Sequence, residues 1–403
     1  MAGPARKGAL SPIALDFGVS SLKAVQLAYG ESPEMVAVAQ LETPADLMLR
    51  DHERVAYQLA QLPVMLRGAG FKGRRAVCSI SAQQTFVARV LAPVTQGVST
   101  RDALGQYLIG AVGLDPSMLI LRETEVGEMM SSEGKRKAVL CVAMPRDVVR
   151  QYMESIRGAK LETVGVHAEH TAVVRLFDCI TRDTKRSEPA HALYVDVGYG
   201  STKFMASRGR ELVSAATVPI GGRDFDSPAA REAGCSLAEA RRRRVTDERG
   251  WNPACKAFHG ELWERVGSLA SAVAMAEGAG GDDAPPASFE SAARPTDSVA
   301  VQEAPAGVTA LDAIAEELGM FTRAHQAVFP EAVLTRTVFL GGECRNVEIA
   351  EHLSAAAGLP GVICDPLRGV QAAHGDTLNG IDFTTPRPDW AVAVGLAFSP
   401  TDL

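Results

Sequence analysis

Two short segments of the chain each combine an aspartate with a glycine turn that carries hydroxyl residues and a lysine. The first, DFGVSSLK, runs from Asp16 to Lys23, and the second, DVGYGSTK, runs from Asp196 to Lys203. Such a turn presents backbone N–H groups and hydroxyl donors to a phosphate chain. An aspartate at a strand end suits a hydrated Mg²⁺, which prefers carboxylates, waters and phosphate oxygens. Each turn alone also fits an ordinary hairpin, but the repeat favours two loops that clamp a nucleotide's phosphates.

A third segment, VFLGGE, ends in two glycines, Gly341 and Gly342, directly after a strand-like run. Glycines there let the backbone approach a flat ring or a sugar closely. Two adjacent glycines after a strand are common by chance, so this segment counts as evidence for a binding loop mainly through its position after the second turn. The sequence contains no HExxH spacing, no GxSxG and no Walker loop, which argues against the enzymes that these motifs mark.

The elements that must position these residues are repeated along the chain. Each aspartate ends a predicted strand, and two further strands follow each turn. The aspartates lie 196 − 16 = 180 residues apart, which predicts two related lobes and not a solenoid with a period of ~20–50 residues. The predicted strands are Ile13–Asp16, Leu22–Leu27 and Met35–Ala39 in the first half, and Leu193–Val197, Lys203–Ser207 and Leu212–Val218 in the second.

Between the two repeats the pattern changes. From about residue 74 to 166 we predict two strands, a helix, two strands and a helix, which form a small α+β unit inserted in the first lobe. We predict a leader at 1–11, a first lobe at 12–182 and a second lobe at 183–403. The segments of the inserted unit are Ala76–Ile80, Thr85–Leu91, Arg101–Val112, Ile120–Val126, Lys137–Met144 and Arg146–Arg157.

The second lobe contains two unusual stretches. Residues 279–307 are small, polar and rich in Pro and Gly, so they cannot bury enough apolar surface to offset chain entropy, and we predict a disordered loop. Four consecutive arginines, Arg241–Arg244, fit either a solvated helix face or a site for an acidic partner or anionic lipid. Helices are predicted at Ala168–Ile180, Thr309–Val328 and Asp389–Phe398, the last returning toward the first lobe.

Composition limits the class of protein. The 403 residues are 46% hydrophobic and 22% charged, which predicts two to three globular domains. The net charge of −7 argues against a dedicated nucleic-acid binder and leaves a local basic patch open. Seven scattered cysteines without a CxxC pair indicate a reducing compartment. We predict neither a signal peptide nor a membrane span, so any membrane role would come through a partner.

The three segments, in this order, resemble the two phosphate loops and the adenosine loop of the actin-like ATPase superfamily. The inserted unit resembles the subdomain of the FtsA and PilM branch, and several stretches favour the PilM family. The resemblance covers about residues 12–399 and implies an α/β fold of two duplicated ribonuclease-H-like lobes with an inserted α+β subdomain. The stretches similar to PilM are Arg74–Val90, Ala143–Arg146, Val218–Gly222, Asp365–Leu367 and Trp390–Phe398.

The resemblance implies ATP and Mg²⁺ as ligands. Asp16 and Asp196 would hold Mg²⁺, mainly through water, and Glu169 or His170 at the start of the crossing helix would orient the attacking water. A solvated helix start explains Glu169 equally well. The phosphates would contact Gly18, Val19, Ser20, Ser21, Lys23, Gly198, Tyr199, Gly200, Ser201 and Thr202. The adenosine would contact Gly341, Gly342 and Glu343.

By the same resemblance, the chain is expected to be a cytoplasmic ATP-binding scaffold of a type IV pilus or type II secretion-like machine. It would hold the cytoplasmic tail of a PilN-like bitopic inner-membrane protein at the inserted subdomain, beside other pilus assembly components, and a homodimer stays open. Hydrolysis is expected to be slow or absent. Two alternatives stay open: a small-molecule kinase, for which we find no convincing catalytic aspartate, and an FtsA-like filament-forming division protein, which usually ends in an amphipathic membrane-targeting helix.

Overall fold

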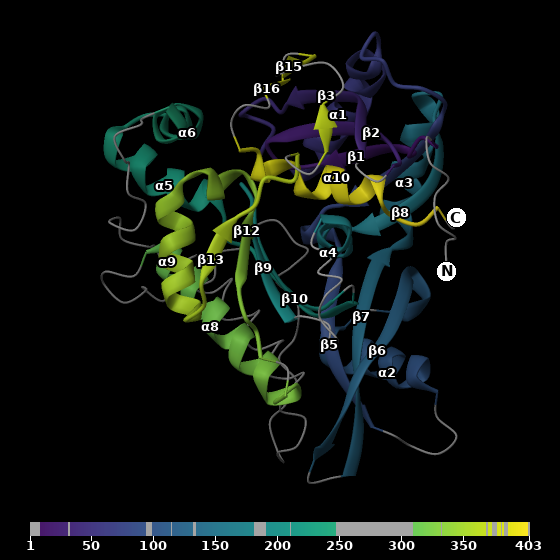
Figure 1. Cartoon of the computed structure of the whole chain (residues 1–403), viewed down its shortest axis with the longest axis vertical. Coiled ribbons are helices and arrows are strands. Elements are labelled where there is room, and N and C mark those ends of the chain that lie inside the picture. The colour runs from purple at the N-terminus through teal and green to yellow at the C-terminus, as the bar shows by residue number, and fades with distance from the viewer. Residues whose placement is uncertain are drawn as a thin grey trace.

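The protein has two lobes with a smaller third unit below the first. A computed structural model describes residues 9–30, 33–93, 99–113, 115–131, 134–180, 191–209, 211–246, 309–331, 333–367, 370–372, 377–379, 381–382 and 386–401. The predicted loop at 279–307 and most of the predicted leader lie outside these residues. In Figure 1 the purple first lobe is at the upper right, the green second lobe at the left and the blue unit at the lower right.

The first lobe is built on a six-stranded sheet whose central strand carries Asp16. In spatial order its strands are β14 (Gln371–Ala372), β3 (Glu34–Glu42), β2 (Ser21–Ala28), β1 (Ile13–Phe17), β4 (Arg75–Ile80) and β8 (Glu162–Ala168). β1, β2 and β3 form an antiparallel meander, whereas β4 and β8 run parallel to β1. β1 is buried along its whole length, as expected for a sheet that is covered on both faces.

The second lobe repeats this arrangement around Asp196. Its five strands, in spatial order, are β11 (Glu211–Val218), β10 (Thr202–Arg208), β9 (His191–Val197), β12 (Thr337–Leu340) and β13 (Gly361–Ile363). β9, β10 and β11 form the antiparallel meander, and β12 pairs parallel with β9. The strand order and directions match those of the first lobe, so the predicted duplication and fold class are confirmed.

Helices cover both faces of the first sheet. On one face, side chains of α1 (Asp51–Leu66) and α3 (Arg146–Gly158), such as Val55 and Tyr152, pack with Leu15 in one apolar cluster. Burying each large apolar side chain of this cluster contributes about 1.5–3 kcal/mol. The same cluster therefore holds α1 against the strand that ends in the first turn.

The other face of the first sheet carries two helices that also meet the second lobe. α4 (Glu169–Ile180) contacts strands of both sheets, and α10 (Ala391–Ala397) packs on α4 and on β1. A Cβ atom on Gly395 would overlap the backbone of Ala172, so only glycine lets the two helices approach this closely. Both helices match predicted ones, with their starts shifted by one and two residues.

In the described part of the second lobe, four α-helices accompany the sheet. They are α5 (Gly222–Ala233), α6 (Leu237–Thr246), α8 (Ala310–Val328) and α9 (Val347–Ala357). α8 begins with a capping box in which the Thr309 hydroxyl and the Asp312 carboxylate each accept a backbone N–H. Within the described ranges, no helix combines the length and the apolar character needed to cross a membrane.

The inserted unit is a three-stranded antiparallel sheet with one helix. Its strands are β5 (Phe86–Pro93), β7 (Gly134–Pro145) and β6 (Leu119–Ser131), with β7 in the middle. α2 (Thr100–Val112) starts at Ser99, whose hydroxyl accepts the N–H of Asp102, and ends at Gly113 in the left-handed conformation. Leu104 and Leu108 of α2 pack against this sheet.

The inserted unit is smaller than the predicted one. We assigned a strand at Ala76–Ile80 and a helix at Arg146–Arg157 to it, but these are β4 and α3, which belong with the first sheet. We also missed β8, which pairs with β4. We therefore propose that the insert comprises residues 86–145. The predicted boundary between the lobes near residue 182 lies outside the described residues and stays a prediction.

Although the insert interrupts the first lobe in sequence, its side chains contact the second lobe. The buried guanidinium of Arg89 on β5 donates to Ser214 Oγ of β11 at 3.0 Å and to the carbonyl of Ala324 in α8 at 2.9 Å. On β6, the Phe329 ring lies where a Cβ atom of Gly127 would be, with one ring carbon 2.8 Å away. The insert is thus packed against the β9 sheet and α8.

Candidate functional site

A cleft of about 610 Å³ lies between the lobes, at the ends of β1 and β9. Its volume is within the range of small-molecule sites. Fifteen predicted site residues line it: Asp16, Gly18, Val19, Ser20, Ser21, Lys23, Glu169, Asp196, Gly198, Tyr199, Gly200, Ser201, Gly341, Gly342 and Glu343. Thr202 does not line it, because this residue is fully buried and its hydroxyl donates to the Ile220 carbonyl.

The two glycine turns face each other across the cleft. The side chain of Val19, at the tip of the first turn, lies 3.0 Å from the position that a Cβ atom on Gly200 would take. Within the first turn, a Cβ on Gly18 would be 2.9 Å from the carbonyl oxygen of Ser21. The second turn repeats this contact between Gly198 and Ser201 at 3.1 Å. Both turns therefore depend on glycine at the same position.

A cluster of buried charges lies beneath the turns. Asp196 pairs with Lys203 across the strands β9 and β10, as Asp16 does with Lys23 across β1 and β2. Lys203 Nζ lies 2.6 Å from Glu169 Oε2 and 3.1 Å from Asp196 Oδ2. Burial alone would lower the pKa of Lys203, but the two carboxylates outweigh burial and raise it, so this lysine stays charged.

The two lysines have different partners. Lys23 Nζ lies 3.6 Å from Asp389 Oδ2, whose carboxylate also accepts two hydrogen bonds from Arg387. Burial would raise the pKa of Asp389, but Lys23 and Arg387 together lower it, so this carboxylate is ionised. Asp16 is left without such a close cation, and burial raises its pKa to about 7 despite the attraction of Lys23.

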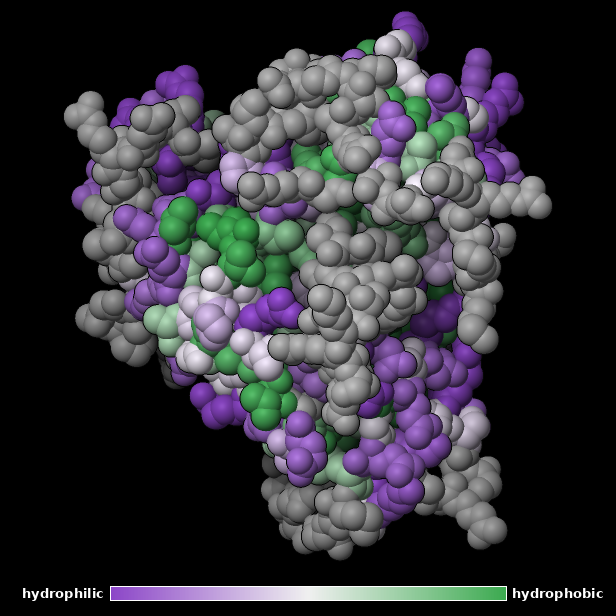
Figure 2. All heavy atoms as spheres, viewed as in Figure 1, coloured by the Kyte–Doolittle hydropathy of each residue, from purple (hydrophilic) through white to green (hydrophobic). Residues whose placement is uncertain are grey.

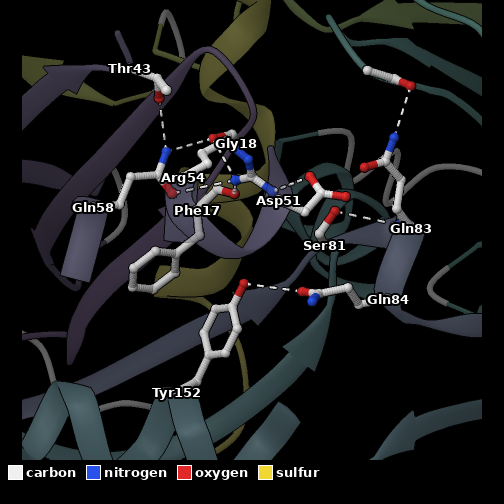
Figure 3. Close-up of polar contacts among 11 residues, drawn as sticks. Phe17, Gly18, Thr43, Asp51, Arg54, Gln58, Ser81, Gln83, Gln84 and Tyr152 are labelled. Carbon is white, nitrogen blue, oxygen red and sulfur yellow. Dashed lines mark hydrogen bonds and ion pairs between the residues drawn. The ribbon is translucent and has the colours of Figure 1, made fainter. Parts of the chain in front are cut away.

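Side chains of α1 hold the first turn in place (Figure 3). Arg54, fully buried, donates to the carbonyls of Phe17 at 3.1 Å and Gly18 at 3.2 Å. Gln58, one helical turn later, donates to the same Gly18 carbonyl at 2.8 Å and to Thr43 Oγ1 at 3.0 Å. The sequence analysis missed these two residues. Their signal was a spacing of four, which places them on one helix face beside the buried Val55 and Leu59.

The link between β4 and the insert also reaches the cleft. It contains the short 3₁₀ helix η1 (Ala82–Gln84), and Ser81 just before it lines the cleft. The Gln83 side chain crosses to the second lobe and donates to the carbonyl of Gly200 at 3.0 Å, whereas Gln84 accepts from the Tyr152 hydroxyl of α3 at 3.3 Å (Figure 3). Neither contact has a signal in the sequence.

Half of the arginine run belongs to the site. The side chain of Arg244 is only 5% exposed and pairs with Asp226 and Glu343, and the Arg241 guanidinium lies 4.6 Å from the centre of the Tyr199 ring. Arg242 and Arg243, by contrast, are exposed and pair with a glutamate on the same helix. The predicted solvated face therefore holds for two of the four arginines. Glu343, predicted at the adenosine, uses one carboxylate oxygen for Arg244.

The third predicted loop follows β12 and is closely packed. Gly341 has φ 85°, a conformation that favours glycine, and a Cβ there would overlap the carbonyl of Val197 and the carboxylate of Asp196. The 3₁₀ helix η4 (Gly342–Arg345) follows it and ends beside the cleft, with Arg345 among the lining residues. Among the described residues, no group of three or more His, Cys, Asp or Glu side chains could hold a metal ion by itself.

The duplicated sheets, the facing turns and the cleft between them define a two-lobed actin-like ATPase fold. More narrowly, the chain has the fold of a chain in the solved "PilM-PilN type IV pilus biogenesis complex", with a TM-score of 0.65, 19% identity, and coverage of 98% of this chain and 100% of that chain. The resemblance to PilM is thus confirmed for the fold. The sequence matches no protein-family model and no curated protein.

Two further solved structures are similar at lower scores. The ethanolamine utilization protein EutJ from Carboxydothermus hydrogenoformans has a TM-score of 0.40 and 12% identity, covering 97% of this chain and 89% of that one. The cytoplasmic domain of EpsL, of the type II secretion system of Vibrio cholerae, has a TM-score of 0.33 and 10% identity, covering 51% and 70%. The fold assignment rests on the PilM–PilN structure alone.

Proposed function

We propose that the chain is a nucleotide-binding scaffold that holds ATP with Mg²⁺ in the cleft between its lobes. The observation that carries this proposal is the pair of matched glycine turns, which face each other across a cleft of about 610 Å³. The phosphates would contact the predicted residues of both turns, without Thr202. The adenosine would lie by Gly341 and Gly342, with Arg241 and Arg345 as additional contacts.

The buried charges suit a divalent cation beside the phosphates. Glu169 and Asp196 share one lysine, Lys203, which leaves an excess of 2 − 1 = 1 negative charge, and Asp16 beside them, with a pKa of about 7, is only partly ionised at neutral pH. A bare phosphate chain would be repelled by these carboxylates. Mg²⁺ keeps several waters and binds one or two carboxylates together with phosphate oxygens, which fits the two aspartates at the strand ends. Nucleotide binding is therefore expected to require Mg²⁺.

Slow or absent hydrolysis follows from the state of Glu169. A general base must be free to accept a proton from water, but Glu169 lies 2.6 Å from the charged Lys203. One of its carboxylate oxygens is therefore occupied by the lysine and does not face a water. We propose that bound ATP serves mainly to hold the two lobes in one arrangement.

The partner is proposed by analogy with the solved relative, which is a complex of PilM with PilN. We infer that this chain binds the cytoplasmic tail of a PilN-like bitopic inner-membrane protein at the inserted subdomain. Its place would be the cytoplasmic side of the inner membrane, in a type IV pilus or type II secretion-like machine. The contacts of the insert with the second lobe would connect the partner site to that lobe.

Calorimetric titration of ATP, with Mg²⁺ and with EDTA, tests the nucleotide site. Asp196→Asn keeps the side-chain volume but removes the charge, and should weaken Mg²⁺-dependent binding at least about tenfold, whereas Asp312→Asn on α8 serves as a control. A folded wild type that binds no ATP would overturn the nucleotide proposal.

The partner proposal is tested separately, with tail peptides of PilN-like proteins and a variant in which a short linker replaces residues 86–145. Unchanged peptide binding by that variant would contradict the insert as the partner site.

A further inference from the structure

Five exposed cationic side chains come from neighbouring segments at the end of the β1 sheet that is far from the cleft. They come from the loop after α1, the start of β4 and the end of α3. We call this surface the basic end, and it consists of Lys72, Arg74, Arg75, Arg157 and Lys160. In Figure 2 hydrophilic side chains project from the upper right of the molecule, the side on which α3 lies in Figure 1.

Backbone contacts bring the three segments to one place. β4 and β8 run parallel, and the N–H of Glu162 at the start of β8 donates to the carbonyl of Arg74 at 2.7 Å. α3 ends just before β8, so its last turn lies beside the start of β4. The loop after α1 joins them because Phe71 and Leu161 pack in the same apolar cluster.

The loop that carries Lys72 has a fixed conformation. The buried Gln26 side chain donates to the Lys72 carbonyl at 2.8 Å and accepts the Lys72 N–H at 2.8 Å. Three glycines in or beside this loop, Gly68, Gly70 and Gly73, have positive φ. Lys160 also has a positive φ, 64°, which is uncommon for a residue with a Cβ atom. The backbone thus holds these cations in place at the surface.

The charges at the basic end are not compensated locally. None of the five side chains lies within ion-pair distance of a carboxylate in the part of the chain that the structure describes. On the insert, by contrast, Arg101, Lys135 and Lys137 each pair with a glutamate. With Glu154 of α3 and Glu162 at the start of β8 counted against them, the charge of these segments is 5 − 2 = +3 on a chain whose net charge is −7.

The basic end and the cleft face opposite ends of the same strand. Arg75 begins β4, and Ser81, just after the strand, lines the cleft. Six strand residues at about 3.3 Å each separate the two surfaces by roughly 17–20 Å. A partner at the basic end would therefore leave the cleft open.

We propose that the basic end is a docking surface for anionic lipid headgroups. Clusters of four to eight Lys and Arg residues bind anionic membranes through their summed attraction to the lipid surface. Phe71 and Leu161 beside these cations pack against the apolar core, so the attraction of this surface to lipid is electrostatic. A single-stranded nucleic acid is disfavoured, because such sites add exposed aromatic rings on which bases stack, whereas the aromatic residue here packs into the core.

The test is sedimentation of the full chain with vesicles. Vesicles with about 30% phosphatidylglycerol in phosphatidylcholine should bind the protein at low salt, and pure phosphatidylcholine vesicles should not. Binding should fall steeply between about 50 and 300 mM salt, because the attraction is screened. The double variants R74E/R75E and R157E/K160E should each weaken binding at least about tenfold. R242E/R243E, which changes two exposed arginines on α6, should bind like the wild type.

Three results would overturn the proposal. The first is no binding to the anionic vesicles at 50 mM salt by a protein that circular dichroism shows to be folded. The second is an equal loss of binding in R242E/R243E, which would indicate an effect of net charge alone. The third is a single-stranded RNA that binds more tightly than the vesicles and displaces them, which would assign the surface to nucleic acid. Glycerol phosphate is used as a soluble competitor to distinguish a lipid surface from a site for a single phosphate group. It should block vesicle binding only if the protein binds single phosphate groups.

Discussion

At the scale of single residues, the two glycine turns are supported in different ways. The first turn is held by Arg54 and Gln58 from its own lobe, which donate to its carbonyls. The second turn receives its side-chain hydrogen bond from Gln83 of the other lobe. A buried arginine that donates to backbone carbonyls is costly to remove, because the buried carbonyl of Phe17 then loses this donor.

Replacing Arg54 by methionine should therefore destabilise the fold and disturb the first turn. Methionine fills much of the volume but donates no hydrogen bond, so we expect a loss of roughly 2–4 kcal/mol in the free energy of unfolding. Urea unfolding measures this loss. Arg50→Met, at the exposed residue before the same helix, is the control and should change stability by less than about 0.5 kcal/mol. An Arg54→Met variant as stable as this control would contradict the role of Arg54 in holding the first turn in place.

Asp16 should make stability depend on pH. Its folded pKa of about 7 lies above the ordinary value of 3.8, so the folded protein keeps this proton over a range in which the unfolded chain loses it. The resulting stability is fully present below about pH 4 and is lost as the pH rises through 7. Asp16→Asn cannot ionise. In EDTA, the stability of this variant relative to the wild type should rise by on the order of 2 kcal/mol between pH 4 and pH 8. The free energy of unfolding of both proteins is measured in urea at each pH. If it changes with pH in the same way in the variant and the wild type, Asp16 does not cause the pH dependence.

Much of the cleft could be predicted at this scale, because the two turns and the double glycine are local patterns that repeat. The contacts of Arg54 and Gln83 could not, since each joins segments far apart in the sequence: 37 residues separate Arg54 from Phe17, and 117 separate Gln83 from Gly200. Thr202 was placed at the phosphates by its position after Ser201, but strand alternation turns its side chain into the second lobe.

At the scale of elements, strand positions were easier to predict than strand partners. The run Ala76–Ile80 reads as a strand from its apolar residues, but nothing local shows that β4 pairs with β1 instead of β5. β8 was missed because Glu162–Ala168 mixes apolar residues with Glu, Thr, Gly and His. The insert was therefore predicted too large, although its own three strands and helix were placed well. Register between distant parallel strands is set by the assembled core and not by the local pattern.

The contact of the insert with the second lobe makes an element-scale prediction. Arg89→Met removes two hydrogen bonds, to Ser214 and to the Ala324 carbonyl, while its apolar body still packs on Phe329. We expect faster amide hydrogen exchange in β5 and β11, and a loss of roughly 1–3 kcal/mol in the free energy of unfolding. Arg122→Met, at an exposed arginine on β6, is the matched control. Unchanged exchange in β5 and β11 would show that the insert does not depend on this contact.

At the scale of the whole molecule, the two lobes that line the cleft are also connected through a third body, the insert. The insert contacts the second lobe through Arg89 and Gly127, and the link that leads into it touches the second glycine turn through Gln83. A ligand that orders this turn would therefore also bias the position of the link. By thermodynamic linkage, a partner that binds the insert and moves the link would change the affinity for nucleotide. The factor would equal the one by which nucleotide changes the affinity for that partner.

Gln83 and its neighbour Gln84 allow this coupling to be tested with two adjacent residues. Gln83 donates to the Gly200 carbonyl across the cleft, whereas Gln84 accepts from Tyr152 within the first lobe. Loss of one hydrogen bond costs about 0.5–1.5 kcal/mol, so Gln83→Ala should weaken Mg²⁺–ATP binding about 2- to 10-fold. Gln84→Ala should leave the affinity unchanged and lower only the stability. Calorimetric titration of both variants decides the matter: equal affinities would mean that the second turn is held without the link, and that nucleotide and insert act independently.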